Sequence, residues 1–219
     1  TRRWRQLIRD ELVELREDGS LLLNMRYFDF ATGLTMVLDA GFEKLFGVPR
    51  RPAETAITQP YMDMALAIQQ VTEEVVFRLA RTAREITDCP NLVMAGGVSL
   101  NCVANGKLLR NGTFERIWIQ PAAGDAGGAL GAALAAWHIW LGHERTPDPT
   151  KDSMRGSYLG PSYGENQILR TARRYKAPFE RFETFDELCG AVTERLTQGA
   201  AVGWFQGRME WGPRALGNR

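Results

Sequence analysis

The sequence has few cysteines and no excess of either charge. Its three cysteines, Cys89, Cys102 and Cys189, are odd in number and widely spaced, and they form no C-x-x-C pair. This pattern argues against a disulfide framework or a zinc ribbon and predicts a protein of the reducing cytoplasm. Lys and Arg number 27 against 26 Asp and Glu, so the electrostatic footprint of a nucleic-acid or anionic-membrane binder is missing. This composition favours small-molecule chemistry.

A long hydrophobic run is also missing. The most apolar stretch, residues 126–141, is rich in Ala and Gly and too short for a convincing membrane span, so it predicts a buried helix. With 44% apolar and 24% charged residues, the chain has the composition of a globular protein with a core. It begins at Thr1 without a signal peptide and ends at Arg219 in a Gly- and Arg-rich run, and we expect an internal segment of a longer protein.

Hydrophobic periodicity predicts two helices in the front part of the chain. Apolar residues among charges over residues 1–20 indicate a surface helix that ends at Gly19. Further on, apolar residues recur at helical spacing, which predicts a long amphipathic helix that starts just after Pro60. Glu73 and Glu74 lie on this helix, and we expect them on a solvated or capping face rather than as a catalytic pair.

Strands and helices alternate through the rest of the chain, which predicts an α/β fold. A strand over residues 91–95 leads into a helix that runs to Leu109, and a strand over residues 116–120 leads into the Ala-rich helix. Two more helices and then a buried strand are predicted over residues 165–175, 185–196 and 200–205.

A polar stretch over residues 144–153 is punctuated by prolines and lacks periodicity, which is typical of a linker. We therefore expect one domain over residues 1–145, a linker over residues 146–156 and the start of a second, truncated domain over residues 157–219.

Paired glycines follow the first predicted strand, in the run Met-Ala-Gly-Gly-Val-Ser-Leu-Asn at residues 94–101. Gly96 and Gly97 permit close approach to the backbone, and the free N–H groups of the following helix favour an anion. By itself a Gly-Gly pair at a strand end is more often a tight turn. The run matches neither G-x-G-x-x-G nor a P-loop.

A second glycine-rich junction follows the next strand, in the run Gln-Pro-Ala-Ala-Gly-Asp-Ala-Gly-Gly-Ala-Leu-Gly at residues 120–131. Each Gly in the first helical turns costs about 1 kcal/mol against Ala, so close approach of a ligand or of another backbone is expected to select them. Asp125 has two readings. It is either an N-cap of the helix or a carboxylate that holds a divalent cation against nucleotide phosphates.

The last thirteen residues, 207–219, contain three arginines among glycines and a proline: Arg208, Arg214 and Arg219. Guanidinium groups suit bidentate contact with phosphate, and glycines let a loop fold around a small anion. Taken singly, each arginine is better explained by a surface salt bridge. Their density in one short run favours the anion site.

These motifs closely resemble those of the antibiotic and nodulation-factor O-carbamoyltransferases. The resemblance spans nearly the whole chain. It is carried by Met-Asp-Met-Ala and Gln-Val-Thr-Glu-Glu within residues 62–74, by Ala-Gly-Gly-Val and Leu-Asn-Cys-Val-Ala-Asn-Gly within residues 95–106, by residues 124–131 and by the terminal run. Several long motifs in the same order make the resemblance specific.

The resemblance implies a fold and an activity. The family has an N-terminal domain of the actin, Hsp70 and sugar-kinase superfold, followed by a YrdC-like carbamoyl-phosphate and nucleotide-binding domain. This chain would hold the C-terminal half of the first domain and a truncated start of the second. In the family, carbamoyl phosphate and ATP yield carbamoyladenylate in the YrdC-like domain, and the other domain passes the carbamoyl group to a hydroxyl of a sugar or antibiotic scaffold.

The resemblance also implies roles for particular residues. Residues expected to line the adenylate are Gly96, Gly97, Val98, Asn101, Gly124, Gly127 and Gly128; Asp125 would ligate the metal, and Arg208, Arg214 and Arg219 would face carbamoyl phosphate or ATP. The implied cofactors are ATP and a divalent metal of the iron, manganese or magnesium class. The implied partners are carbamoyl phosphate and a hydroxylated small-molecule or oligosaccharide acceptor, without nucleic acid or membrane. A homodimer is left open.

One departure concerns the metal. The family's metal site also uses histidines from the front half of the nucleotide domain, which this chain does not include. Its own His138 and His143 lie five residues apart at a helix end and point to different faces, which indicates structural or exposed roles. We therefore expect an incomplete metal site and no turnover by this segment alone.

Two alternatives stay open at this point. One is a threonylcarbamoyl-transfer protein or a sugar kinase of the same superfold, although the terminal Gly/Arg run speaks against both. The other is a non-catalytic module that senses a nucleotide or holds domains together. The acceptor is not encoded in a readable motif, but overall similarity favours a nodulation-type enzyme that acts on a chitin-oligosaccharide lipid.

Overall fold

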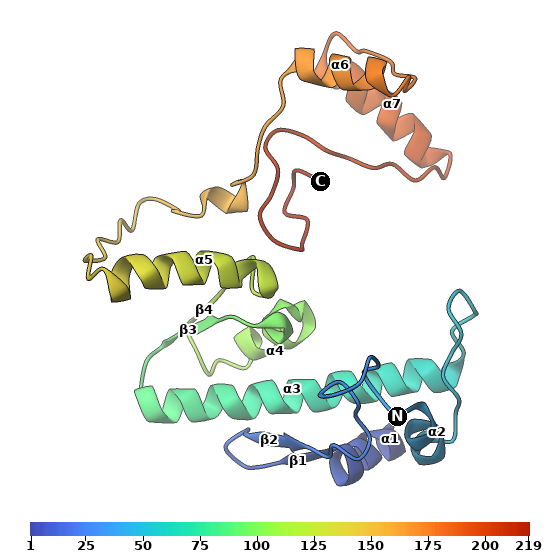
Figure 1. The fold of residues 1–219 in the computed structure, drawn as a ribbon, viewed down its shortest axis with the longest axis vertical. Coiled ribbons are helices and arrows are strands. Elements are labelled where there is room, and N and C mark those ends of the chain that lie inside the picture. The colour runs from blue at the N-terminus through green and yellow to red at the C-terminus, as the bar shows by residue number, and fades with distance from the viewer. The chain divides into compact units, whose positions relative to one another are not determined.

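The computed structural model describes residues 1–219 as a mixed α/β chain (Figure 1). Its strands form two two-stranded sheets, β1 with β2 and β3 with β4. The helices are α1 (Arg2–Leu7), α2 (Asp39–Phe46), α3 (Gln59–Thr87), α4 (Cys102–Arg110), α5 (Asp125–Ala135), α6 (Glu165–Arg174) and α7 (Phe185–Thr197), and the strands are β1 (Val13–Leu15), β2 (Leu21–Leu23), β3 (Asn91–Met94) and β4 (Arg116–Ile119). The predicted α/β class is confirmed, whereas the two named superfolds stay predictions.

The chain divides into two compact units. The first unit comprises Thr1–Met94 and Asn101–Trp118, and the second comprises Ala95–Leu100 and Ile119–Arg219. The predicted linker over residues 146–156 lies within the second unit, and the domain boundary there stays a prediction.

The first residues form more than the single surface helix that their periodicity predicts. After α1, a π-helical turn over Ile8–Leu12 buries both of its terminal residues in the core, and the chain then becomes β1. The prediction of a helix up to Gly19 is therefore wrong. β1 pairs antiparallel with β2, and Gly19 makes the connecting turn with φ +89°. A side chain at Gly19 would also collide with the backbone of Leu79 on α3. Both the positive φ and this close contact therefore require glycine at this position.

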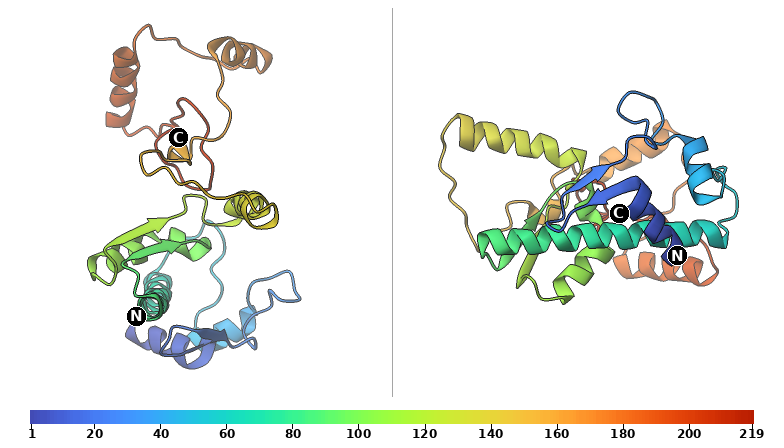
Figure 2. Two further views of the ribbon diagram at one scale, coloured as in Figure 1. Left: turned by 90° about the vertical axis from the view of Figure 1, so that its left-hand side faces the viewer. Right: turned by 90° about the horizontal axis from the view of Figure 1, so that it is seen from below.

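α3 is the axis of the first unit, with the N-terminal elements on one side and α4 on the other (Figures 1 and 2). The predicted amphipathic helix is confirmed over Gln59–Thr87, and Pro60 lies in its first turn, where no amide has to be satisfied. Ala67 and Val71 join Ile8, Leu12, Val13 and Phe46 in one hydrophobic cluster. One turn further along, Val76 and Ala80 join Leu108 and Phe114 in a second cluster.

Glu73 and Glu74 are not on a solvated face, so that prediction is wrong. The Glu73 side chain is only 10% exposed and accepts hydrogen bonds from Lys107 Nζ at 2.6 and 2.7 Å. Glu74 is ion-paired with three guanidinium groups, which are described below. The helical spacing alone could not reveal these pairings, because Lys107 comes from α4 and Arg5 comes from α1.

Of the four elements predicted in the second unit, two agree with the structure and two do not. α6 and α7 agree with the predictions, and Thr184 caps α7 by a reciprocal pair of hydrogen bonds with Glu187, both 3.2 Å long. The Ala-rich helix forms as α5 and a π-helical extension over Ala136–Trp140, but no residue in it is buried, so the predicted buried helix is wrong. Residues 200–205 form no strand and are largely exposed, so that prediction is wrong as well.

None of the helices combines the length and the apolar character needed to cross a membrane.

Candidate functional site

The two glycine-rich junctions meet in the second unit. The Gly96 amide donates a 2.8 Å hydrogen bond to the carbonyl of Ala123, which joins the turn after β3 to the turn after β4. Ser99 closes the first turn, because its amide and its hydroxyl donate to the Gly96 carbonyl at 3.0 and 2.6 Å. The sequence predicted both turns, and only the fold brings them together.

Four of the predicted nucleotide-contacting glycines face open space. A Cβ placed on Gly96, Gly97, Gly124 or Gly128 meets no atom within 4 Å. Gly96 also has φ +99°, a conformation that side chains rarely adopt. These turns therefore leave bare backbone accessible to a ligand, which suits the close approach of phosphate groups.

Gly127 has a different role. A side chain there would collide with the carbonyl oxygen of Ala122, so this glycine is selected by the packing of one backbone on another. The Ala122 side of the contact is buried. Of the two explanations expected for the costly glycines of this helix, ligand approach suits Gly124 and Gly128, and backbone approach explains Gly127.

Asp125 is the first residue of α5, and Gly124 occupies the N-cap position. The reading of Asp125 as a helix cap is therefore wrong: its side chain caps nothing. It is exposed in the first turn, where a negative charge interacts favourably with the helix dipole. No group of three His, Cys, Asp or Glu side chains that could hold a metal ion is present. Asp125 alone offers one carboxylate, which does not make a metal site, and no chemical step is assigned to a metal here.

The two remaining predicted contacts, Val98 and Asn101, differ in their surroundings. Val98 is exposed in the short 3₁₀ turn that follows Gly96. Asn101 belongs to the first unit and caps α4 by accepting a 3.1 Å hydrogen bond from the Ala104 amide. Its amide group also exchanges hydrogen bonds with Gln69 of α3, at 2.8 and 3.2 Å. Asn101 thus has a clear structural task in addition to the predicted role.

The histidines agree with the structural or exposed roles expected of them. The His143 ring stacks on Trp137 with a centroid separation of 3.8 Å, and His138 Nδ1 lies 2.9 Å from the His143 carbonyl oxygen.

The terminal Gly/Arg run packs on the second junction. A Cβ on Gly212 would lie 3.0 Å from the Pro121 carbonyl oxygen and 3.2 Å from Ala122 Cα, so the two segments are in direct backbone contact. Gly212 has φ +113°, which also requires glycine. Residues 95–100 of the first motif, the second junction and the terminal run therefore gather around Ala122 and Ala123 within one unit.

The three arginines of this run have different environments. Arg208 donates a 2.7 Å hydrogen bond to the Gly160 carbonyl. Arg219 pairs with Glu210 at 3.0 Å and donates to the carbonyls of Gly212 and Arg214. The Arg214 guanidinium makes no hydrogen bond or ion pair and is exposed. Arg214 is therefore the arginine best placed to bind an incoming anion.

Glu210 is a residue that the motif analysis did not single out. Its side chain is fully buried and accepts hydrogen bonds from the Leu216 and Asn218 amides, both at 2.8 Å, besides the bond from Arg219. Burial raises the pKa of the Glu210 carboxyl, but these three donors outweigh burial and hold the pKa below its usual value. Glu210 therefore fixes the loop that presents Arg214.

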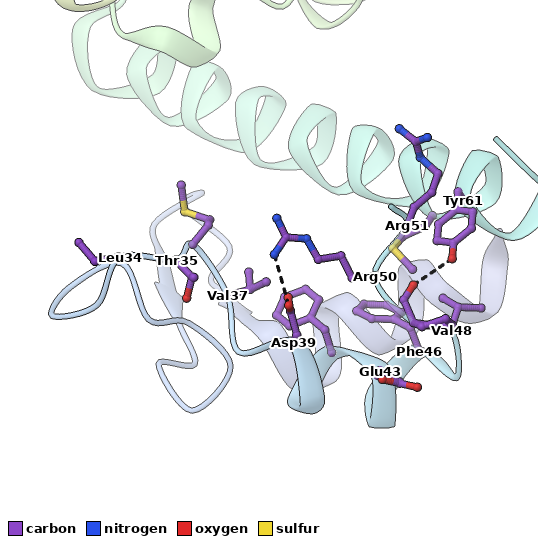
Figure 3. Close-up of a pocket in the computed structure, with 14 residues that line it drawn as sticks. Leu34, Thr35, Val37, Asp39, Glu43, Phe46, Val48, Arg50, Arg51 and Tyr61 are labelled. Atoms are coloured by element: carbon purple, nitrogen blue, oxygen red, sulfur yellow. Dashed lines mark hydrogen bonds and ion pairs between the residues drawn. The ribbon is translucent and has the colours of Figure 1, made fainter. Parts of the chain in front are cut away.

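A hollow of about 440 Å³ lies in the first unit (Figure 3). Its floor includes Phe46 and Val48, and Arg50 reaches across it to pair with Asp39 at 3.3 Å. Tyr61 closes one end by donating a 2.9 Å hydrogen bond to the Pro49 carbonyl. None of the predicted site residues lines this hollow.

Comparison with known proteins matches both ends of the chain to one family. The family described as Carbamoyltransferase N-terminus matches residues 3–134, and Carbamoyltransferase C-terminus matches residues 193–219. The chain is 53% identical to an uncharacterized protein of Synechocystis over 215 residues, which covers 97% of this chain and 34% of that protein.

Two named relatives are more distant. Nodulation protein NolNO of Sinorhizobium fredii is 40% identical over 74% of this chain and 23% of its own length. The 3'-hydroxymethylcephem-O-carbamoyltransferase of Streptomyces clavuligerus is 32% identical over 70% of this chain and 27% of its own length. The chain thus spans about a third or less of these relatives. The matched ranges contain all the predicted site residues, and the chain belongs to the carbamoyltransferase family.

Proposed function

We propose that the protein containing this chain transfers a carbamoyl group from carbamoyl phosphate, in an ATP-dependent reaction, to a hydroxyl of a sugar or natural-product acceptor. The observation that carries the proposal is the contact of the terminal Gly/Arg run with the glycine-rich junctions, because it joins an unpaired Arg214 to exposed backbone in one unit. The names of the relatives support O-carbamoyl transfer as the reaction class.

The reaction divides into two steps. ATP, carbamoyl phosphate and one water yield carbamoyladenylate, pyrophosphate and phosphate. The acceptor hydroxyl then attacks the carbamoyl carbon, loses its proton and displaces AMP. In this chain, the open backbone at Gly96, Gly97, Gly124 and Gly128 would bind the adenylate, and Arg214 would grip a phosphate or carbamoyl oxygen by its guanidinium fork.

Arg208 and Arg219 serve the same step in a positioning role. Each is anchored to a backbone carbonyl of the second unit, and Arg219 is also paired with the buried Glu210. Together they hold the loop in shape, so that the backbone that carries Arg214 does not have to be ordered when the substrate arrives. This proposal places the protein in the cytoplasm, where ATP is available, and a nodulation factor stays a candidate acceptor.

The test uses the full-length protein with ATP, carbamoyl phosphate and a panel of hydroxylated acceptors that includes chitin oligosaccharides. We expect release of pyrophosphate and the mass of one added carbamoyl group on an acceptor. If pyrophosphate is not released under any of these conditions, the non-catalytic nucleotide-binding alternative replaces the proposal. Transfer of a phosphoryl group from ATP to a sugar would instead identify a kinase.

A further inference from the structure

A polar hollow of about 500 Å³ lies in the first unit and is separate from the residues of the proposed reaction. Its floor is one face of α3 from Gln70 to Arg81, and the apolar Phe77 lies in the middle of that face. Its walls are Arg5 of α1, Lys107 of α4 and the loop residues Asn111 and Thr113.

The charges around this hollow do not balance. Glu74 is contacted by Arg78 at 2.6 Å, Arg5 at 3.0 Å and Arg9 at 3.3 Å, so three guanidinium groups share one carboxylate. Lys107 neutralises Glu73, and Arg81 lies 3.8 Å from the exposed Glu85. Of these groups, four cations and two carboxylates line the hollow, which leaves an excess of two positive charges: Arg5, Arg78, Arg81 and Lys107 against Glu73 and Glu74. Such an excess in a concave site concentrates the field and attracts anions.

Several donors in the hollow are also unused. Arg5 donates to Glu74 through one nitrogen, which leaves two without a partner. Arg81 donates to the Glu17 carbonyl through one nitrogen and pairs with Glu85 through another, which leaves one without a partner. The Asn111 side-chain oxygen accepts from Thr113, which fixes the side chain and leaves its NH₂ group unpaired. Guanidinium forks and a fixed amide are donors that suit the several oxygens of a phosphate.

We propose that this hollow binds a phosphate-bearing small molecule of two or more negative charges. The cations supply the charge, Arg5, Arg81 and Asn111 supply unpaired donors, and Phe77 offers an apolar surface for the rest of the ligand. Glu73, which is buried, and Glu74, which is partly buried, hold the cations in place, because Glu74 orients Arg5 and Arg78 while Glu73 orients Lys107. Bound phosphate would relieve the repulsion among the guanidinium groups.

Titration of the ¹⁵N-labelled full chain with inorganic phosphate and with pyrophosphate tests this site. We expect saturable amide shifts confined to α1, residues 70–81 and residues 107–113, with pyrophosphate binding more tightly. Arg81→Gln should weaken pyrophosphate binding about tenfold, the value of one charge-assisted contact of about 1.4 kcal/mol. Arg5→Gln should weaken it by a similar factor.

Arg84→Gln is the matched control, because Arg84 lies on the same helix, pairs with Asp88 and does not line the hollow. We expect pyrophosphate binding to change less than about twofold in this variant, since Arg84 makes no contact in the hollow and its charge already pairs with Asp88. Absence of saturable shifts in these segments would overturn the proposal. Equal weakening by Arg84→Gln and Arg81→Gln would also overturn it, because it would indicate only general attraction by positive charge. Shifts confined to residues 95–100 and 207–219 would support the proposed reaction and reject this hollow.

Discussion

Lys107→Met should destabilise the chain more than Glu73→Gln, although both changes remove the same ion pair. The Lys107 side chain is 45% exposed, whereas that of Glu73 is 10% exposed. Without Lys107, the buried carboxylate keeps only the 2.9 Å hydrogen bond from Gln69. Without the carboxylate, the ammonium group of Lys107 reaches water. The two changes therefore leave very different groups unpaired.

The expected losses lie between two limits. Removing one partner of a fully buried pair costs about 3–5 kcal/mol, and an exposed pair contributes about 0–1 kcal/mol. Because Lys107 is half exposed, we expect a loss of about 2–3 kcal/mol in the free energy of unfolding for Lys107→Met and of about 1 kcal/mol for Glu73→Gln. Urea denaturation at pH 7 measures both values. Lys151→Met is the control, since its exposed pair with Asp148 should contribute less than about 0.5 kcal/mol.

The pH dependence provides a second check. Burial raises the pKa of Glu73, but the hydrogen bonds from Lys107 and Gln69 outweigh burial and lower the pKa below its ordinary value of 4.5. A group with a lowered folded pKa stabilises the fold above the unfolded pKa and loses this contribution as the pH falls through the folded value. Stability should therefore fall less steeply below pH 4.5 in Glu73→Gln than in the unchanged chain. Equal losses of unfolding free energy in Lys107→Met and Glu73→Gln would refute the reasoning. So would a Glu73→Gln variant whose stability falls below pH 4.5 as steeply as that of the unchanged chain.

Four further predictions concern the proposed site and the chain's organisation. In the full-length protein, Arg214→Lys should impair pyrophosphate release from ATP plus carbamoyl phosphate but spare transfer from supplied carbamoyladenylate, because lysine keeps the charge and loses the fork; loss of both half-reactions together would contradict this. The family resemblance assigns Asp125 to a metal site that this chain does not complete; if ligands from the rest of the full-length protein complete it, Asp125→Asn should abolish carbamoyl transfer at a stability cost of less than about 1 kcal/mol, since Asp125 caps no amide; unchanged transfer would remove Asp125 from the site. Gly127→Ala should lower the melting temperature, because the new methyl group collides with the Ala122 carbonyl, whereas Gly128→Ala, the matched control, should not. Limited proteolysis should cut fastest between Arg145 and Arg155, and cleavage that is no faster there than elsewhere would show that the predicted domain boundary is wrong.

The long helices could be predicted from the sequence because their signals are local. The apolar spacing of α3 and the capping pair of Thr184 and Glu187 at α7 involve residues a few positions apart. Strands were harder to predict, because a strand forms only where another strand pairs with it. β1 continues a helical apolar pattern and becomes a strand by pairing with β2, and residues 200–205 look like a strand but have no partner.

Part of the candidate site could likewise be predicted from the sequence, and part could not. The glycine-rich turns and the Gly/Arg run stand out in the sequence, because glycine is costly in helices and arginine clusters suit anions. Their contact around Ala122 is a tertiary contact between segments far apart in the chain, so it could not be predicted from local sequence. Glu210 illustrates the limit, since its importance depends on the chain folding back to bring Leu216, Asn218 and Arg219 to one carboxylate.

The sequence by itself determined the family, the long helices and the residue types available for phosphate chemistry, because these depend on ordered motifs and short-range periodicity. Only the tertiary structure decided which charged side chains are buried and which are free. Glu73 meets a lysine 34 residues away, and Glu74 gathers arginines from two helices, while Arg214 remains unpaired in a loop where Arg219 is bound. Burial and pairing depend on what packs over a residue, and distant parts of the chain supply that cover.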